Sequence, residues 1–259
     1  MKSAIQSLFD FDLVDSAGRF IKTLNKADTE RGDRSGYKQK KTFAPSGLGY
    51  GKGRCPRFWY YAFNGADWVD KNDYRGLRNM ENGTDRHDRF ETLLQSFDNG
   101  LVIKTEEELR SDDPPVFGYV DGQIQWEGKR WVLEFKTKKS GQYKKLRASG
   151  KPPLYNIIQI LVYMHILRYK YGMLIYEDKE THDMFAVPIV MEGTIKEYTK
   201  ELVDWMNLVY DTVTQEDAPL PERVFTEKSK ECKYCPLKQH CWDGEEGEVQ
   251  LPRQPLLKI

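Results

Sequence analysis

Three charged residues lie in two predicted strands that are otherwise rich in aromatic and branched apolar side chains. Asp121 is part of FGYVDGQIQW (117–126), and Glu134 and Lys136 are part of RWVLEFK (130–136). Side chains alternate between the two faces of a strand, so Glu134 and Lys136 share one face. If the apolar residues between them face the core, this pair emerges on the opposite face. There it is either a solvated ion pair or part of a reactive site.

These residue types suit the hydrolysis of a phosphodiester. Divalent metal ions stabilise charge on phosphoryl oxygens and supply a hydroxide-like nucleophile near neutral pH. Mg²⁺ prefers oxygen ligands and keeps several waters, so Asp121 and Glu134 are suitable ligands. Lys136 would then hold the attacking water and offset developing negative charge.

Two further polar groups accompany predicted helices. His87 lies at the edge of an apolar stripe in TDRHDRFETLLQSF, where a histidine is usually structural or solvated, but an imidazole near two carboxylates is also a possible metal ligand. Gln159 and Tyr163 are four residues apart on an apolar helix and share a face. They form either a polar boundary of the core or a pair that reaches a bound phosphate.

A basic segment, KTKKSGQYKKLRASGK (136–151), follows the second strand and contains no acidic residue. A run of like charge is usually a solvated surface, but here it begins at the proposed catalytic strand of an otherwise neutral protein. We therefore expect a loop that follows nucleic-acid phosphates, with Tyr143 placed to stack on a base. The expected DNA-binding residues are Lys138, Lys139, Tyr143, Lys144, Lys145 and Arg147.

The four cysteines form the most specific pattern. Cys232, Cys235 and Cys241 are spaced C-x2-C-x5-C, and Cys55 lies far upstream. Four thiolates would clasp the C-terminal tail to the N-terminal region, around either zinc or an iron–sulfur cluster. His240, next to Cys241, is an alternative ligand of lower rank.

Composition limits the class of protein. The chain has 259 residues, a formal net charge of zero, 39% hydrophobic and 31% charged residues, which indicates a folded protein with a core. Any binding of nucleic acid must therefore use a local basic surface. No apolar run has membrane-spanning length, and the acidic N-terminus is unlike a signal peptide, so we expect a cytoplasmic protein whose cysteines bind metal rather than form disulfides.

The elements that must position these residues follow from periodicity and turn signals. Helices are predicted in CPRFWYYAFNG, in TDRHDRFETLLQSF up to Asn99-Gly100, in LYNIIQILVYMHILRYKYG and over 193–215, where Thr194 and Glu197 have capping-box spacing. Two hairpins are predicted, over 117–136 and 172–191. Residues 32–54 read as a loop or mobile arm, and the tail from Asp217 as irregular. The pattern predicts an α/β fold with a central mixed sheet flanked by helices, and three regions: 1–54, 55–245 and 246–259.

The ordered set of motifs resembles the PD-(D/E)XK nucleases of the RecB type, and most closely the iron–sulfur exonucleases related to the CRISPR-associated ones and to the AddB nuclease domain. The resemblance rests on GTDRH, GYVD, E-x-K, Q-x-x-x-Y and the four cysteines, and it covers residues 55 to 241. It implies a restriction-endonuclease-like core, Mg²⁺ or Mn²⁺ on His87, Asp121 and Glu134 with the backbone carbonyl of Phe135, and a [4Fe–4S] cluster on the cysteines.

The function expected from these features is a metal-dependent DNA exonuclease acting on single-stranded or frayed ends, in repair, recombination or phage DNA metabolism. In this reading Asp121, Glu134, Lys136, Gln159 and Tyr163 are the catalytic residues. A bacterial cell, a phage-encoded origin and a partner such as a helicase, recombinase or single-strand-binding protein all remain compatible with it. Two alternatives stay open: a non-catalytic module that binds DNA ends, and a nuclease acting on RNA.

Overall fold

The computed structural model describes residues 11–97 and 100–257. At its centre is a five-stranded sheet of order β3-β4-β5-β6-β7, in which β5 and β6 run parallel and the other neighbours run antiparallel. The strands are β3 (Val102–Asp112), β4 (Pro115–Trp126), β5 (Lys129–Lys138), β6 (Tyr171–Asp178) and β7 (Met184–Val190). The predicted α/β class with a central mixed sheet is confirmed, and both predicted hairpins are present.

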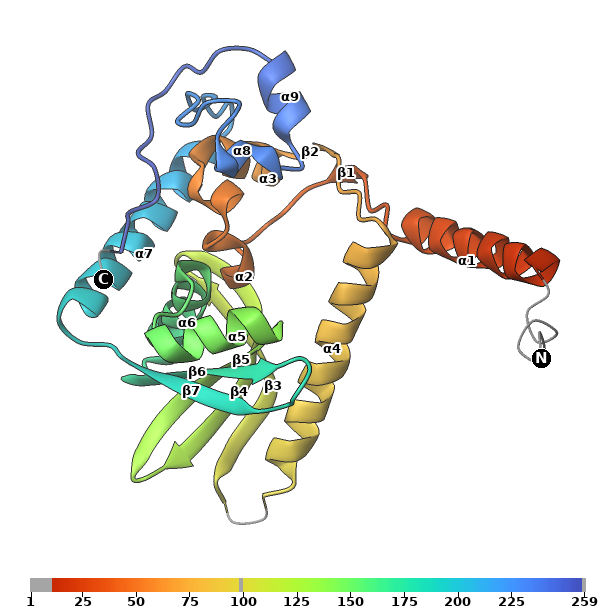
Figure 1. Cartoon of the computed structure of the whole chain (residues 1–259). Coiled ribbons are helices and arrows are strands. Elements are labelled where there is room, and N and C mark those ends of the chain that lie inside the picture. The colour runs from red at the N-terminus through yellow and green to blue at the C-terminus, as the bar shows by residue number, and fades with distance from the viewer. Residues whose placement is uncertain (1–10, 98–99, 258–259) are drawn as a thin grey trace, which may run out of the picture.

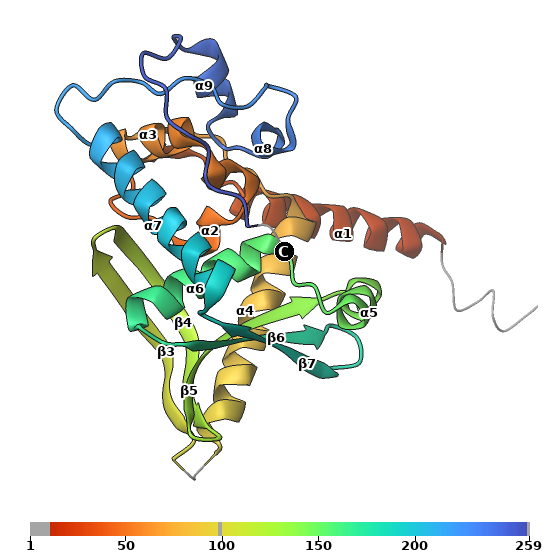
Figure 2. The same cartoon turned by 90° about the vertical axis from the view of Figure 1, so that its left-hand side faces the viewer.

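Helices cover both faces of this sheet (Figures 1 and 2). α4 (Tyr74–Gln95) lies on one face and α6 (Leu154–Leu167) on the other. On the α4 side, Phe135 stacks on Phe90 with ring centroids 4.4 Å apart. On the α6 side, Val132 belongs to the larger core and is completely buried. Strand β5 is thus buried on both faces, as expected for the centre of a mixed sheet.

This double coverage corrects the simplest expectation for the charged pair on β5. Glu134 does not emerge into solvent, because its side chain is 0% exposed. The solvated-pair alternative for Glu134 and Lys136 is therefore wrong. A carboxylate at such a position is costly unless a cation or donors compensate it.

The chain before the sheet is more ordered than its composition suggested. Its elements are α1 (Phe11–Arg31), β1 (Gly36–Lys38), α2 (Pro45–Leu48), the 3-10 helix η1 (Gly51–Arg54), α3 (Pro56–Asn64) and β2 (Ala66–Trp68). The loop predicted over 32–54 is wrong for its second half. Phe43 and Leu48 are completely buried in the main core, and burying these apolar side chains fixes the segment.

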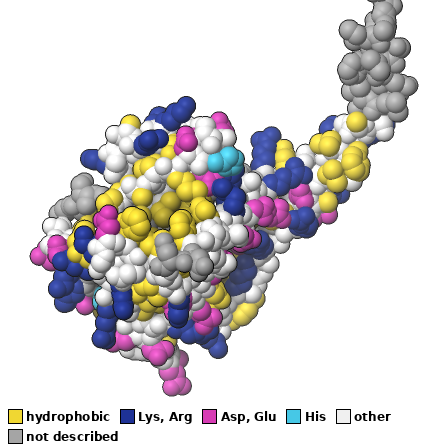
Figure 3. Space-filling view, turned by 90° about the horizontal axis from the view of Figure 1, so that it is seen from below, with side chains coloured by type: hydrophobic (Ala, Val, Ile, Leu, Met, Phe, Trp, Pro, Cys, Tyr) yellow, Lys and Arg dark blue, Asp and Glu magenta, His cyan; other side chains and the backbone are white. Residues whose placement is uncertain are grey.

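α1 projects from the body of the molecule (Figures 1 and 3). Its C-terminal end is attached to α4 through Asp28, which forms ion pairs with Arg31 and Arg78. α4 itself begins well before the predicted TDRH start and ends at Gln95. The helix was predicted to stop at Asn99-Gly100, and Asn99 lies outside the described residues.

The C-terminal part adds α7 (Gly193–Val213) and two short helices, α8 (Lys230–Lys233) and α9 (Lys238–Asp243), within a tail predicted to be irregular. The predicted capping box is wrong. α7 begins at Gly193, with Glu192 as its N-cap, so Thr194 is already inside the helix. None of the helices in the described ranges is long and apolar enough to cross a membrane.

The basic segment after β5 is a helix rather than a loop. α5 (Ser140–Ser149) and α6 form the crossover between the parallel strands β5 and β6. Tyr143 and Leu146, three residues apart, are the buried face of α5, and their burial anchors the helix on the sheet.

Candidate active site

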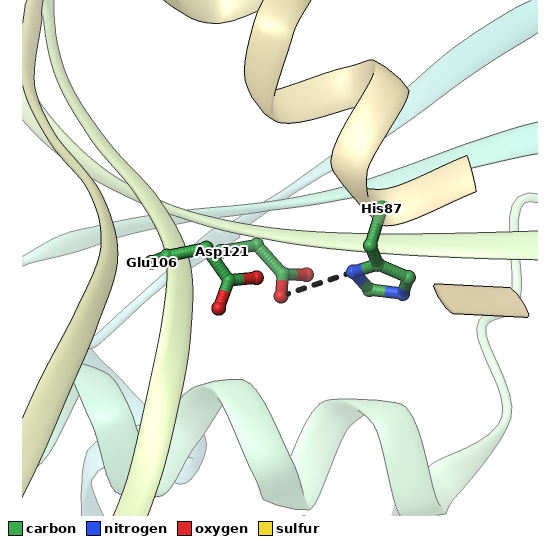
Figure 4. A group of neighbouring side chains, drawn as sticks. All are labelled: His87, Glu106 and Asp121. Carbon is green, nitrogen blue, oxygen red and sulfur yellow. Dashed lines mark ion pairs between the residues drawn. The ribbon is translucent and has the colours of Figure 1, made fainter. Parts of the chain in front are cut away.

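Three potential metal ligands from three different elements meet beside the sheet (Figure 4). His87 of α4, Glu106 of β3 and Asp121 of β4 each offer one ligand atom, and these atoms lie within 4.8 Å of one another. Nδ1 of His87 is 3.3 Å from Oδ1 of Asp121. Two carboxylates and one imidazole form a donor set that suits Mn²⁺ or Mg²⁺.

The second carboxylate oxygen of Asp121 is held by the backbone. The N–H of Phe135 donates a 2.6 Å hydrogen bond to Oδ2 of Asp121. The paired part of β4 and β5 ends at Gly122 and Leu133, so this bond spans the place where the two strands separate. The N–H and C=O of one strand residue point to the same neighbouring strand. The carbonyl of Phe135 therefore also points toward β4, the strand that carries Asp121. This direction agrees with the metal-binding role expected for that carbonyl.

The same neighbours set the pKa and the orientation of the His87 imidazole. Burial disfavours its charged form, but the hydrogen bond and the negative charge of Asp121 outweigh burial and raise the pKa of His87. The ring also meets Phe135 edge-on, with centroids 5.3 Å apart. His87 is thus fixed between a carboxylate and an aromatic ring and remains 27% exposed at its side chain.

Glu106 is the site residue that sequence reasoning missed. The register of β3 and β4 pairs Thr105 with Gly122 and Glu107 with Val120, which places Glu106 opposite Asp121. Glu106 adopts a positive φ of 47°, and partial burial followed by the charge of Asp121 raises its pKa. The run TEEEL is visible in the sequence, but only the register identifies which glutamate faces the site.

Glu134 lies next to this group and is not one of the three residues at ligand spacing. Its Oε1 is 2.5 Å from Nζ of Lys136. Apart from that ammonium, no donor in the described part of the chain reaches either oxygen, although both are buried. Burial and the charge of Asp121 raise the pKa of Glu134 to about 8. A buried carboxylate with so few partners fits a place beside a cation.

Lys136 remains a charged group in these surroundings. Burial disfavours its ammonium, but the negative charges of Glu134 and Asp121 outweigh burial and raise the pKa of Lys136. Its side chain keeps 24% exposure, so the ammonium can reach solvent or substrate. Among the residues expected to act in catalysis, Lys136, Glu134 and Asp121 are brought together.

Gln159 and Tyr163 of α6 form the opposite wall. Nε2 of Gln159 donates a 3.2 Å hydrogen bond to Oη of Tyr163, and both side chains are buried. A Cβ at Gly118 would lie 3.2 Å from that hydroxyl, which places Tyr163 over β4, three residues before Asp121. Burial, followed by the charge of Glu134, raises the pKa of Tyr163, so the phenol stays protonated and can donate a hydrogen bond.

Some of the expected DNA-binding residues are exposed in the structure and others are not. Lys139, Lys144, Lys145 and Arg147 are exposed along α5 and its N-cap. Lys138 points back toward α6, where its Nζ is 3.1 Å from Oη of Tyr155. Tyr143 is only 2% exposed and packs against Phe185, so it has no free face for a base. The stacking role expected for Tyr143 is excluded by its burial.

The four cysteines line one small cavity of about 30 Å³ between α3 and the tail. Cys55 is the N-cap of α3, Cys232 lies in α8 and Cys241 in α9. Burial raises the pKa of the Cys55 thiol to about 12 and that of Cys235 to about 11. His240 does not line this cavity; its ring meets Tyr61 edge-on.

The polypeptide around the thiols is already tied together. Arg57, completely buried, donates hydrogen bonds to the carbonyls of Pro221, at 2.9 Å, and Cys241, at 3.5 Å. Arg223 donates to the same carbonyl of Cys241 at 2.9 Å. Arg57 thus joins α3 to the tail, and Arg223 ties two parts of the tail together.

Comparisons with known proteins gave matches among solved structures alone. No family model and no curated protein matches the chain. The crystal structure of SSO0001 is 18% identical, with a TM-score of 0.44 over 86% of this chain and 96% of that one. The alkaline exonuclease LHK-Exo from Laribacter hongkongensis, in complex with dAMP, is 16% identical, with a TM-score of 0.40 over 52% of this chain and 67% of that one. A phage-related exonuclease from Haemophilus somnus 129PT is 16% identical, with a TM-score of 0.34 over 50% and 71%.

Proposed function

We propose that this protein is a divalent-metal-dependent nuclease that hydrolyses phosphodiester bonds of DNA from an end. The observation that carries the proposal is the meeting of His87, Glu106 and Asp121 at ligand spacing, beside the buried pair of Glu134 and Lys136. Carboxylates, an imidazole and one ammonium are the groups that phosphoryl transfer to water requires.

The donor set indicates which residues would hold the metal. His87, Glu106 and Asp121 are at ligand spacing. The carbonyl of Phe135 would point to the same side of β5 as its N–H, which donates to Asp121. Glu134, whose buried oxygens lack donors other than Lys136, would complete the set. When bound, Mg²⁺ or Mn²⁺ would supply Lewis acidity and lower the pKa of water.

The remaining residues have roles that follow from their positions. The ammonium of Lys136, held at 2.5 Å from Glu134, would orient the attacking water and stabilise negative charge on the phosphate. The protonated phenol of Tyr163, oriented by Gln159, would donate a hydrogen bond to a phosphate oxygen. Lys139, Lys144, Lys145 and Arg147 on α5 would attract the nucleic-acid backbone.

We also propose that Cys55, Cys232, Cys235 and Cys241 hold a [4Fe–4S] cluster that fastens the C-terminal tail to α3. Support comes from the cavity that the four thiols share and from their one-plus-three layout in the sequence, which differs from the paired cysteines usual in structural zinc sites. The cluster would be structural, because metal binding by such sites contributes to folding free energy.

The test is digestion of end-labelled single-stranded DNA, duplex DNA and RNA with Mg²⁺ or Mn²⁺. We expect release of nucleotides from DNA by the wild type and loss of cleavage in Lys136→Met and Asp121→Asn. Lys196→Met, an exposed lysine on α7, is the matched control and should cleave like the wild type. Salt-sensitive DNA binding without metal-dependent cleavage would contradict the proposal, and preferred digestion of RNA would correct the substrate.

A further inference from the structure

A cavity of about 640 Å³ lies between the N-terminal segment and the cysteine-containing tail, and its lining is basic and aromatic. Its wall includes Lys40, Tyr50, Lys52, Trp68, Lys230 and Tyr234. In Figure 1, α2 and the segment around it lie between the upper group of helices and the sheet. None of these residues belongs to the catalytic group described above.

One wall of the cavity packs on the elements that carry the active site. The N–H of Phe43 donates to the carbonyl of Pro115 at 2.8 Å, and the N–H of Phe117 donates to the carbonyl of Phe43 at 3.0 Å. A Cβ at Gly49 would lie 2.3 Å from Cα of Tyr155, so the segment is pressed against α6. Residues 43–50 therefore rest on β4 and α6, the elements that carry Asp121 and Tyr163.

The cations in the cavity lack anionic partners. Lys40, Lys52 and Lys230 form no ion pair with any described residue, whereas the carboxylate of Glu231 in the same wall is bound by Arg54 at 3.2 Å. Burial, followed by the charges of Lys52 and Lys38, lowers the pKa of Lys40. Positive charges gathered in a partly buried place favour an anionic ligand.

A residue of the cavity wall carries an unused donor. The indole of Trp68 is 6% exposed and lines the cavity, and its Nε1 has no hydrogen-bond partner within the described part of the structure. The ammonium groups of Lys38 and Lys40 lie 5.6 and 5.7 Å from the centroid of this ring. A buried donor without a partner is costly, and the ring that carries it is flanked by two ammonium groups.

Tyr50 connects this cavity with the catalytic pair. One face of its ring stacks on Tyr155, with centroids 4.7 Å apart, while 52% of Tyr50 is exposed. The hydroxyl of Tyr155 lies 3.1 Å from Nζ of Lys138, which is two residues beyond Lys136 on β5. An exposed aromatic ring near the end of the strand that carries Lys136 is a surface on which an unpaired base can stack.

We propose that the cavity is a subsite for the unpaired strand of the substrate, in which Lys40 and Lys52 bind backbone phosphates and Tyr50 stacks on a base next to the scissile bond. The assignment rests on the proposed nuclease function and specifies its substrate as single-stranded at this position. An aromatic face between lysines suits a single strand, because bases of a duplex have no free faces.

The test is binding of a labelled single strand in the presence of Ca²⁺, measured by fluorescence anisotropy across a range of salt concentrations. For single strands the slope of log affinity against log salt changes by about 0.7 for each phosphate contact, so Lys40→Gln/Lys52→Gln should reduce its magnitude by about 1.4. Lys196→Gln, on α7, should leave the slope unchanged. Thermal unfolding would verify that the variants are folded.

A second pair of variants separates stacking from charge. Tyr50→Ala should weaken binding of the single strand about tenfold, and Tyr50→Phe should bind like the wild type. A Lys40→Gln/Lys52→Gln protein with wild-type slope and affinity would overturn the subsite. Equal binding of blunt duplex with no effect of Tyr50→Ala would overturn its assignment to an unpaired strand.

The two proposals fail in different ways. A wild type that binds single strands through Lys40 and Lys52 but cleaves no nucleic acid with Mn²⁺ would remove the nuclease function and leave the subsite in place. A wild type that cleaves DNA but binds it independently of these lysines would remove the subsite and leave the nuclease function in place.

Discussion

Asp121 accepts a 2.6 Å hydrogen bond at Oδ2 from the backbone N–H of Phe135, just beyond the last residue pair of β4 and β5. Its other oxygen, Oδ1, lies 3.3 Å from Nδ1 of His87. The carboxylate is therefore oriented at both ends before any metal binds. An oriented ligand of this kind loses little conformational freedom on metal binding.

Asp121→Asn should abolish tight metal binding. The amide has the shape of the carboxylate but carries no charge. Its NH₂ group would face either the N–H of Phe135 or Nδ1 of His87. We expect Mn²⁺ affinity to fall by at least about 100-fold, measured by isothermal titration calorimetry. Asp204→Asn, at an exposed position on α7, is the matched control. Unchanged Mn²⁺ affinity in Asp121→Asn would remove this residue from the site.

Metal binding should weaken as the pH falls through the pKa of His87. That pKa is raised in the metal-free protein because the bond to Asp121 outweighs burial, and a protonated imidazole cannot bind metal. Below the pKa we expect Mn²⁺ affinity to lose up to about tenfold per pH unit from this one proton. His87→Asn should show weaker binding with a shallower pH dependence, and His240→Asn should match the wild type. Histidine ordinarily titrates between about pH 5 and pH 8. A wild-type Mn²⁺ affinity that does not change over this range would contradict the role of His87 as a ligand.

The stability of the metal-free protein should fall as the pH rises from about 4.5 to about 8. The folded state raises the pKa of Glu134 to about 8, mainly through burial. The folded protein thus binds more protons than the unfolded chain in this range, and stability decreases with pH. Thermal unfolding in a chelator, compared with Glu134→Gln, measures the effect. The variant should lack this decrease, and identical pH profiles for the two proteins would contradict the raised pKa.

Glu177→Ala should destabilise the protein and displace α4. Glu177 of β6 is 0% exposed and forms ion pairs with Arg86, one residue before His87 in α4, and Arg89, two residues after it. Removing Glu177 leaves the largely buried charge of Arg86 without its partner, so we expect a loss of about 3 kcal/mol in the free energy of unfolding, measured with urea. Removal of Asp204, which pairs with Lys200 on the exposed face of α7, should cost little. Equal losses in both variants would argue against this anchor for His87.

Anaerobically purified protein should be brown and contain iron and acid-labile sulfide. Cys235→Ser should lose the colour and be destabilised by more than about 4 kcal/mol, because loss of a structural metal group is among the largest effects of single substitutions. Elemental analysis and thermal unfolding check both expectations. Stoichiometric zinc in a colourless protein would replace the cluster with a single metal ion.

Local patterns determined much of the architecture. Alternation and turn residues predicted the strands around Asp121 and Glu134, and apolar spacing predicted α4, α6 and α7, because these patterns depend on neighbours along the chain. The wrong predictions also came from reading local composition alone. The basic composition of 140–149 suggested a loop, but the burial of Tyr143 and Leu146 selects a helix.

The residue types of the site were visible in the sequence, whereas their grouping was not. Asp121, His87 and the Glu134–Lys136 pair were recognisable from chemistry and spacing. Glu106 required the register of β3 against β4, and the burial of Glu134 required α6 to cover the sheet. Likewise, Lys40 and Tyr50 acquired a possible role only because residues 43–50 rest on β4 and α6. Sequence spacing describes neighbours along one strand or helix. The ligand geometry of His87, Glu106 and Asp121 depends on residues 15 to 34 positions apart, whose distances only tertiary packing sets.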